Sequence, residues 1–314
     1  MTHLEVWAPD GVGEVRRGAD LGALLAGLVD LEDGDVVLVT SKVVSKAEGR
    51  VVDGTREEAL PRETARLVAR RGPVRIVRTH HGLTLAAAGI DASNVEPGSV
   101  VLLPVDPDVS ARRIRERLHE LTGRSVGVVV TDTAGRAWRE GQTDLAVGAA
   151  GLTVLEDFAG RRDGYGNDLV VTAPAVADEL AGAGELAQGK LAGRPFAVVR
   201  GRADLVLPLG DDGPGAAALV RPDGGDLFGW GSREAVLRAL RADPADAAAF
   251  GAPSTAGELA EAVAELGGGV RAEEGAVVVE NLAPETLRTL AFAHGWEADM
   301  TEADGSVRLR PVRP

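Results

Sequence analysis

Short apolar runs and longer periodic segments alternate along the first 200 residues. Aliphatic runs bounded by turn residues predict buried strands at 36–39, 74–77, 100–103, 127–130 and 196–199. Apolar positions spaced three or four apart predict helices at 21–31, 57–70, 111–121, 175–187 and 233–240. This alternation predicts a principal α/β unit, of mixed α+β character, with an irregular mixed sheet.

The composition changes near Asp243-Pro244, and the remaining residues repeat the alternation on a smaller scale. They predict helices at 256–266 and 284–294 and strands at 276–280 and 307–309. We therefore expect one domain over residues 1–244 and a small α+β appendage over 245–314. No internal repeat of fixed period is found.

Composition narrows the class of protein. The 314 residues are 45% hydrophobic but only 3% aromatic, so the core is built from Val, Leu and Ala. No 18-residue apolar run and no basic-then-apolar leader is found, which predicts a cytoplasmic protein that does not interact with membranes. The absence of cysteine excludes disulfides and Cys-ligated metals.

The net charge of −14 argues against nucleic-acid binding, which requires a broad basic surface. A phosphorylated small molecule is still compatible with this charge, because local cations and bound divalent ions are sufficient to hold it. Carboxylates are suitable ligands for Mg²⁺ or Mn²⁺.

Two hydroxyls and two ammonium groups follow the strand at 36–39. Ser41 and Ser45 are four residues apart, as are Lys42 and Lys46, so each pair shares a face if a helix begins at Ser41. The positive end of such a helix suits phosphate oxygens. An ordinary capped helix with a solvated lysine face is an equally good interpretation of this spacing.

Two acidic centres lie in predicted loops or at strand ends. Asp91 and Asn94 are three residues apart in one loop, and Asp132 is beside Thr133 after the strand at 127–130. Together they can supply oxygen ligands to one or two divalent ions. Turn formation and helix capping are the simpler explanation of these residues taken alone.

Three further patterns have a structural explanation that we prefer. His80-His81 can form a metal pair, but adjacent side chains usually diverge. Arg136 and Arg139, one helical turn apart, can clamp a carboxylate or phosphate. The segment 184–190 matches the first seven positions of a P-loop, but Leu191 replaces the required Ser or Thr, and a helix precedes it.

Several of these segments, in this order, resemble the coenzyme F420-0:L-glutamate ligase family. The resemblance covers roughly residues 5 to 240 and is carried by Thr40-Ser-Lys-Val-Val-Ser-Lys-Ala-Glu-Gly-Arg50, Ala86-Ala-Ala-Gly-Ile-Asp-Ala-Ser-Asn-Val95, Leu103-Pro-Val-Asp-Pro-Asp108, Thr131-Asp-Thr-Ala-Gly-Arg-Ala-Trp-Arg139 and Ala175-Val-Ala-Asp-Glu-Leu180. It implies the F420 ligase-like fold.

The resemblance also implies an activity and a set of site residues. The activity is GTP-dependent addition of L-glutamate to coenzyme F420-0, followed by γ-linked glutamates, with two divalent cations (Mg²⁺ or Mn²⁺); K⁺ is a further candidate cation. The residues implied to contact GTP are Val12, Gly13, Glu14, Val15, Ser41, Lys46 and Asn94. Those implied to bind metal are Asp91, Asp132 and Thr133, of which Asp91 and Asp132 would be essential to catalysis. Gly13 departs from the pattern, because the family commonly has proline there.

This chemistry explains the residue types. A carboxylate becomes an electrophile when the γ-phosphate of GTP converts it to an acyl phosphate, and the amine of glutamate then attacks. Metals and Lys46 neutralise the crowded anions, and no enzyme nucleophile is required. The sequence does not identify the base that deprotonates the ammonium group.

The remaining expectations concern the carboxyl-terminal segment, the oligomeric state and two alternative functions. Some relatives carry a nitroreductase-like flavin domain, but residues 245–314 are too few and lack its motifs, so we expect no FMN site. The family implies a homodimer. The alternatives are a ligase with a different acceptor, or a catalytically silent GTP-binding or scaffold protein.

Overall fold

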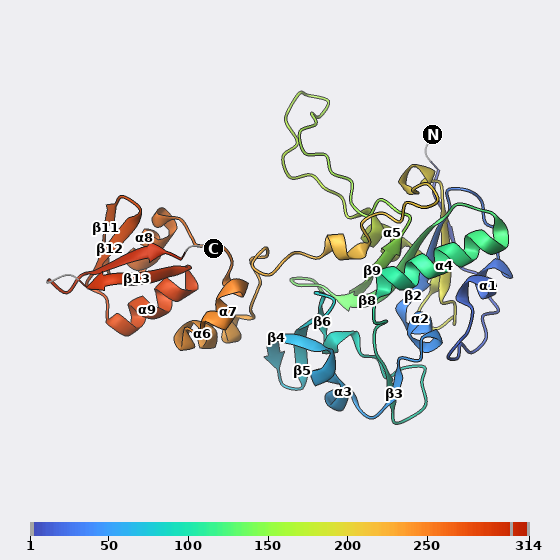
Figure 1. Cartoon of the computed structure of the whole chain (residues 1–314), viewed down its shortest axis with the longest axis horizontal. Helices are drawn as coiled ribbons and strands as arrows, with labels where there is room; N and C mark the ends of the chain where they lie inside the picture. The colour runs from blue at the N-terminus through green and yellow to red at the C-terminus, as the bar shows by residue number, and fades with distance from the viewer. Residues whose placement is uncertain (1–2, 302–303, 313–314) are drawn as a thin grey trace. The chain divides into compact units, whose positions relative to one another are not determined.

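The computed structural model describes residues 3–301 and 304–312, except for the side chain of Met300. The chain divides into two compact units (Figure 1), and each is described by itself. The first unit comprises residues 1–66 and 76–220, and the second comprises 67–75 and 221–314. This division falls after Val220, so it does not coincide with the domain boundary expected after residue 244.

A five-stranded mixed sheet is the centre of the first unit. In spatial order its strands are β1 (Glu5–Trp7), β10 (Phe196–Arg200), β2 (Val36–Thr40), β8 (Gly127–Gly135) and β9 (Gln142–Ala150). Only β2 and β8 are parallel, and the other neighbouring strands are antiparallel. The predicted mixed α/β fold with irregular sheets is therefore confirmed.

Helices cover both faces of this sheet, which explains why β2 is apolar without alternation. Val37 and Val39 pack in a core with α1 (Leu21–Ala26) and α4 (Pro107–Thr122). Val36 and Leu38 point to the opposite face, where α5 (Val176–Gln188) supplies the packing. The sheet is thus the middle of three layers.

Two glycines allow the layers to approach closely. A Cβ at Gly184 of α5 would lie 2.2 Å from Cδ1 of the buried Leu38. A Cβ at Gly148 of β9 would lie 2.3 Å from the Pro107 carbonyl oxygen at the start of α4. A larger residue at Gly148 therefore requires the backbone at the start of α4 to move, whereas one at Gly184 requires the buried Leu38 side chain to shift.

Smaller elements complete the first unit. They are α2 (Ser41–Ala47), β3 (Val51–Asp53), α3 (Arg56–Glu63), β5 (Val74–Thr79), β6 (Thr84–Ala86), η1 (Ala87–Gly89), β7 (Ser99–Val101), η2 (Ala203–Leu205) and η3 (Ala216–Leu219). Strand β3 pairs with β7, and residues 76–78 of β5 pair with β6.

Several sequence-based boundaries are wrong. The helix predicted over 21–31 ends at Ala26, and the strand predicted over 127–130 continues to Gly135. The helix predicted over 57–70 ends at Glu63, and β4 (Thr64–Arg71) follows it, because these residues add a strand beside β5. Sheet pairing therefore overrides a helical spacing of apolar residues. The helix predicted from residue 111 begins at Pro107, because the Asp106 carboxylate caps it by accepting the N–H of Val109.

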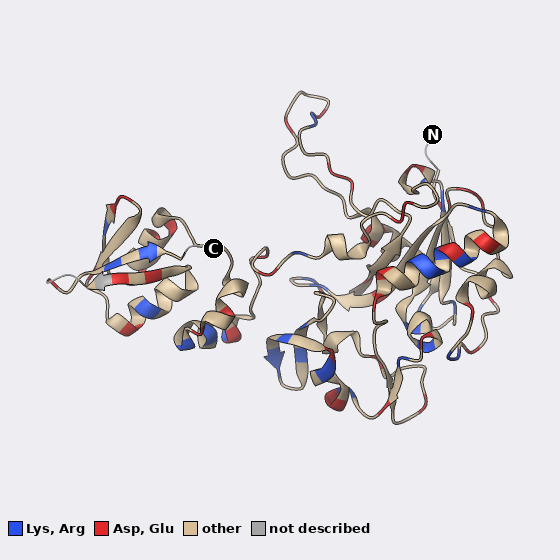
Figure 2. Ribbon diagram, in the orientation of Figure 1, with Lys and Arg blue, Asp and Glu red and all other residues tan. Residues whose placement is uncertain are grey.

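Lys or Arg and Asp or Glu are interspersed along α4 (Figure 2). Arg117, for example, pairs with Glu120 on the same helix and with Asp20 before α1. This helix accordingly presents charges of both signs.

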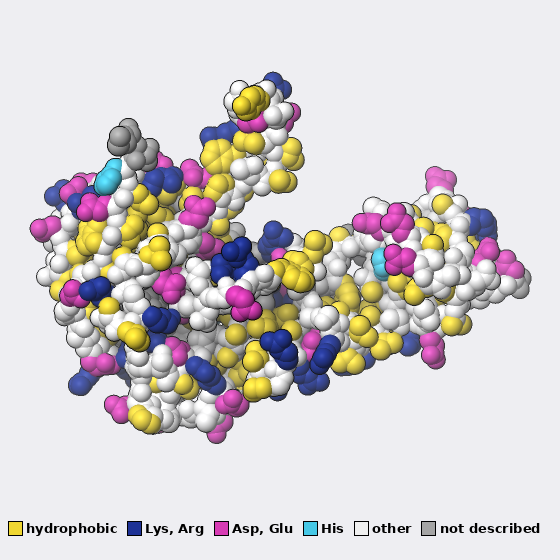
Figure 3. All heavy atoms as spheres, turned by 180° about the vertical axis from the view of Figure 1, so that it is seen from behind, with side chains coloured by type: hydrophobic (Ala, Val, Ile, Leu, Met, Phe, Trp, Pro, Cys, Tyr) yellow, Lys and Arg dark blue, Asp and Glu magenta, His cyan; other side chains and the backbone are white. Residues whose placement is uncertain are grey.

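The segment between β9 and α5 extends from the sheet as a long loop (Figures 1 and 3). Its two sides are joined by backbone hydrogen bonds, including Gly160 N–H to Leu169 and Leu169 N–H to Arg161. Tyr165 and Val171 on this loop are 96% and 90% exposed. The apolar spheres along it in Figure 3 therefore form no part of the core.

The second unit contains a four-stranded antiparallel sheet in the order β11 (Gly269–Glu273), β12 (Ala276–Glu280), β14 (Val307–Pro311) and β13 (Trp296–Thr301). Helices α8 (Ala256–Glu265) and α9 (Pro284–Ala293) share one core with it. This arrangement matches the predicted α+β appendage. Helices α6 (Ser232–Arg241) and α7 (Pro244–Ala247) precede these elements, with η4 (Ala248–Phe250).

Within the described ranges, the model contains no helix whose length and apolarity would allow it to cross a membrane. Residues 1 and 2, on which part of the leader expectation rests, lie outside those ranges.

Replacing Gly148 with alanine is expected to lower the free energy of unfolding by about 2–3 kcal/mol, because the added methyl collides with the backbone of Pro107. Gly135→Ala is the matched control on β8, since its Cβ would meet nothing within 4 Å. Urea denaturation of both variants measures the difference. Equal stability of the two variants would contradict the proposed close packing of β9 on α4.

Candidate functional site

The parallel pair β2 and β8 places Ser41 beside Asp132. Thr40 is the register partner of Thr131. Strand β2 ends at Thr40, whereas β8 continues to Gly135. Ser41 therefore lies at the carboxyl end of β2, an edge where ligands commonly bind, beside Asp132 within β8. The Ser41 hydroxyl donates to Oδ1 of Asp132 over 2.8 Å.

Ser41 does not cap the following helix. The N-cap of α2 is Thr40, whose side chain makes no capping bond, and Ser41 is the first helical residue. The helix contains only seven residues, Ser41–Ala47. The interpretation of Ser41 as an ordinary cap is therefore wrong, because its hydroxyl donates to the Asp132 carboxylate instead.

Strand alternation sends Asp132 and Thr133 to opposite faces of β8. Thr133 shares its face with the buried Thr131, and both hydroxyls donate to Asp144 on β9, over 2.7 and 3.0 Å. The register of β8 and β9 shifts between Val130 and Thr131, next to these groups. Such a bulge changes the direction of the following side chains.

Asp91 reaches the same neighbourhood through a strained turn. Ala87, Ala88 and Gly89 of η1 all have positive φ values, of 49°, 56° and 71°. A Cβ at Gly89 would lie 3.3 Å from Oδ2 of Asp132. Two residues later Asp91 is fixed by paired backbone hydrogen bonds with Val101.

The Asp91 carboxylate holds a local turn and an ion pair together. Oδ1 accepts the Ser93 N–H over 2.8 Å, which is the Asx-type turn expected for such a residue. Oδ2 contacts the Lys42 ammonium at 2.6 Å and accepts the Ser93 hydroxyl over 2.8 Å. Burial alone would raise the pKa of Asp91, but Lys42 and Ser93 bring it down to about 2.

Asp132 has the opposite electrostatic balance. Burial raises its pKa to about 7, the negative charges of Asp144 and Asp91 contribute, and the hydrogen bond from Ser41 only partly offsets them. The carboxyl thus resists ionisation while no cation accompanies it. A bound cation would relieve this repulsion.

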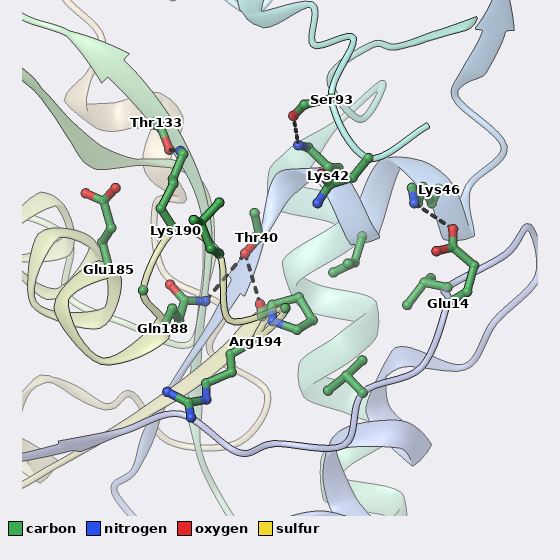
Figure 4. A pocket seen from close by; sticks show the side chains of 18 of the residues that line it. Glu14, Thr40, Lys42, Lys46, Ser93, Thr133, Glu185, Gln188, Lys190 and Arg194 are labelled. Atoms are coloured by element: carbon green, nitrogen blue, oxygen red, sulfur yellow. Dashed lines mark hydrogen bonds and ion pairs between the residues drawn. The ribbon is translucent and has the colours of Figure 1, made fainter. Parts of the chain in front are cut away.

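A cavity of about 620 Å³ opens beside these groups. It is bounded by the early loop, α2, the loop after Asp91, strands β8 and β9, and the end of α5 with the loop that follows it. Figure 4 shows Lys42, Lys46 and Lys190 around this space. Lys46 is 8% exposed and pairs with Glu14 over 2.6 Å.

Most of the residues assigned to the site by resemblance surround this cavity. Those that line it are Val12, Gly13, Glu14, Val15, Lys46, Asn94 and Thr133. Ser41, Asp91 and Asp132 are not among the lining residues, but Lys42, which lines the cavity, contacts Asp91 directly. Gly13 stands where the family commonly has proline, and there is open space around it, since a Cβ there would meet nothing within 4 Å.

Sequence reasoning missed a second wall of the cavity. Asp144, Glu185, Gln188 and Arg194 line it. The amide of Gln188 donates to the Thr40 hydroxyl over 3.4 Å. The signal available for Asp144 was its place just before the apolar residues 145–150 of β9. Nothing local connects the other three residues to the site, because α5 brings Glu185 and Gln188 there and the loop after α5 brings Arg194.

The P-loop-like segment makes an unexpected contribution. Its last residue, Lys190, lines the cavity and donates to the Thr133 hydroxyl over 3.2 Å (Figure 4). The segment is nevertheless the end of α5, as its poor fit to a P-loop indicated.

The histidine and arginine pairs lie outside the site. Nε2 of His80 contacts the Arg62 carbonyl oxygen, and Nε2 of His81 contacts that of Pro104, so the structural interpretation is supported. Arg136 and Arg139 are not one helical turn apart, because they lie in the connection from β8 to β9. Arg136 donates to the Glu140 carbonyl oxygen.

Comparison with known proteins identifies the family. The model described as F420-0:Gamma-glutamyl ligase matches residues 11–72 and 54–201, well over half of the chain. The chain belongs to the F420-0:gamma-glutamyl ligase family. This membership confirms the resemblance and the prediction of an enzyme of the ligase class.

Similar proteins extend over the same region. The chain is 41% identical to the coenzyme F420:L-glutamate ligase of Archaeoglobus fulgidus over 221 residues, which are 63% of this chain and 88% of that protein. It is 38% identical to the enzyme of that name from Methanothermobacter thermautotrophicus over 242 residues, 69% of this chain and 94% of that protein. Most of the second unit lies beyond the residues matched by the family model.

Asp132→Asn is expected to stabilise the metal-free protein at pH 8 by roughly 2–4 kcal/mol, since one pKa unit corresponds to about 1.4 kcal/mol. The raised pKa of Asp132 means that the folded state binds the proton of this carboxyl group more tightly than the unfolded state does. The wild-type protein therefore loses stability as the pH rises from about 4 to about 7, and the advantage of the variant appears over that range.

Urea denaturation in EDTA across this pH range measures the difference in the free energy of unfolding between Asp132→Asn and the wild type. Asp33→Asn is the control, because Asp33 accepts the N–H of Ser125 before β8 and its pKa is lowered. It should not stabilise the protein at pH 8. An Asp132→Asn effect that is independent of pH would contradict the assignment.

Proposed function

We propose that this chain catalyses GTP- and divalent-cation-dependent addition of L-glutamate to coenzyme F420-0, and then γ-linked addition of further glutamates, with release of GDP and phosphate. The observation that carries the proposal is the cavity. Residues from separated segments, assigned to GTP by family resemblance, line one space beside two carboxylates. Membership of the ligase family agrees with this reaction class.

The reaction requires a carboxylate to become an electrophile. The terminal carboxylate of the acceptor attacks the γ-phosphorus of GTP, GDP leaves, and an acyl phosphate forms. The glutamate amine, after losing its proton, attacks the acyl carbon, and phosphate leaves with the electron pair of the broken C–O bond. Positioning and charge neutralisation carry such a transfer, so no enzyme nucleophile is needed.

Lys46 is the residue we assign to the phosphates of GTP. It is buried at the cavity wall, and its partner Glu14 is exposed and lines the same cavity. A phosphate oxygen can replace the carboxylate as the partner of this ammonium, because both are anionic acceptors. The early loop and Asn94 complete the assigned nucleotide wall.

The residues present fit divalent cations of the Mg²⁺ or Mn²⁺ kind. Within residues 3–301 and 304–312, no three acidic or imidazole side chains converge as a ready-made metal cage. Mg²⁺ usually needs only one or two carboxylates together with substrate phosphates. Asp91 and Asp132 would hold one ion and Thr133 would contribute to a second. When bound, such ions neutralise the triphosphate and orient the reacting oxygens.

Asp144 is a positioning residue in this proposal. Its carboxylate accepts from both Thr131 and Thr133, so it fixes the Thr133 hydroxyl at the cavity. The homodimer and the absence of FMN remain predictions.

Phosphate release is expected only when GTP, a divalent cation, L-glutamate and coenzyme F420-0 are all present. Asp132→Ala should lower this rate at least 100-fold, because it removes a carboxylate assigned to the metal. Asp33→Ala is the matched control, since Asp33 lies before β2, at the opposite end of that strand from Ser41.

Mass spectrometry of the product identifies the acceptor and the number of glutamates added. Retained turnover in Asp132→Ala would contradict the metal assignment. Binding of GTP without turnover on any deazaflavin acceptor would support the silent GTP-binding alternative instead.

A further inference from the structure

Lys42 lies between the cavity and Asp91. Its side chain lines the cavity, and its ammonium group is 2.6 Å from Oδ2 of Asp91. The same group is 2.7 Å from the Ser93 hydroxyl (Figure 4). Asp91 itself does not line the cavity. A ligand that approaches Asp91 from this space therefore meets Lys42 or Ser93, both of which line the cavity.

The Asp91 carboxylate already has several donors. Oδ1 accepts the Ser93 N–H, and Arg56 lies 3.4 Å away. Oδ2 accepts the Ser93 hydroxyl as well as contacting Lys42. A metal ion that binds this carboxylate must displace a donor. Lys42 and Ser93 both line the cavity, and Lys42 is the charged donor of the two.

The Lys42–Asp91 ion pair is partly shielded from solvent. Competition between the Lys42 ammonium and a metal ion for Asp91 should therefore be measurable. The Lys42 and Asp91 side chains are 21% and 36% exposed, so neither is fully solvated. An ammonium and a divalent cation seek the same oxygen lone pairs and repel each other at short range. A displaced Lys42 has a flexible four-carbon stem with which to reach other anions in the cavity.

Lys46 provides a comparison on the same helix. It is four residues further along α2, lines the same cavity and also forms a 2.6 Å ion pair, but its partner is Glu14. The two lysines thus share residue type, helix and cavity, and differ in the carboxylate that they neutralise. Of the two lysines, Lys42 is the one whose ion-pair partner is a carboxylate assigned to a metal.

We propose that Lys42 is an internal counter-ion, which occupies the cation position at Asp91 in the ligand-free enzyme and moves to the phosphates of the nucleotide when a divalent ion binds. This inference rests on the proposed function, because it uses the metal and nucleotide assigned there. It gives Lys42 two successive anionic partners and delays tight metal binding until the triphosphate arrives.

Mn²⁺ binding to the EDTA-treated, desalted full-length protein tests the first step, with free Mn²⁺ measured by electron paramagnetic resonance. Without nucleotide, Lys42→Met is expected to bind Mn²⁺ about tenfold more tightly than the wild type, because the competing ammonium is gone. Lys42→Arg keeps the charge and should bind like the wild type. Lys46→Met should also leave this affinity unchanged.

GTP binding at saturating Mn²⁺ tests the second step. Lys42→Met is expected to raise the Kd for GTP about tenfold, because the phosphates lose a cation. Tighter Mn²⁺ binding together with weaker GTP binding is a pair of opposite changes that a general loss of structure would not produce. An unchanged Kd for GTP would overturn the movement of Lys42.

Asp132→Asn separates this inference from the proposed function. If this variant weakens Mn²⁺ binding while Lys42→Met binds Mn²⁺ no more tightly than the wild type, the counter-ion role is overturned and the metal site stands. If Asp132→Asn leaves Mn²⁺ affinity unchanged, the metal site of the proposed function is itself contradicted.

Discussion

The parallel pairing of β2 with β8 is the constraint on which the site depends. These central strands are buried on both faces, so the packing of α1, α4 and α5 fixes their register. A one-residue slip would reverse the side chains that meet each layer. The same register places Ser41, the first residue after β2, against Asp132 within β8.

The carboxylates of Asp91 and Asp132 are stabilised to very different degrees by their neighbours. Asp91 has Lys42 and Ser93, and its pKa falls, whereas Asp132 is left with the Ser41 hydroxyl and its pKa rises. The nearby Asp144 accepts two threonine hydroxyls. Such an arrangement sacrifices stability in the ligand-free state, which is common where a site is built to receive cations and anions together.

Close packing also supports the site from a distance. Gly148 allows α4 to lie against β9, and Gly184 allows α5 to lie against β2. Helix α5 places Gln188 at the cavity and the turn after it places Lys190 there, both more than 40 residues beyond Asp144 in the chain. Its position therefore shapes a wall that has no local signature in the chain.

The sequence by itself determined the buried strands, most helices, the α+β character of the carboxyl-terminal residues and, through family motifs, the segments around the cavity. These features depend on local spacing and on ordered motifs. Tertiary structure alone decided that residues 64–71 form a strand and that Ser41 binds a carboxylate instead of capping α2. It also decided that Asp144 and Lys190 join the site, because strand pairing and helix packing bring together residues whose separation in sequence carries no information about contact.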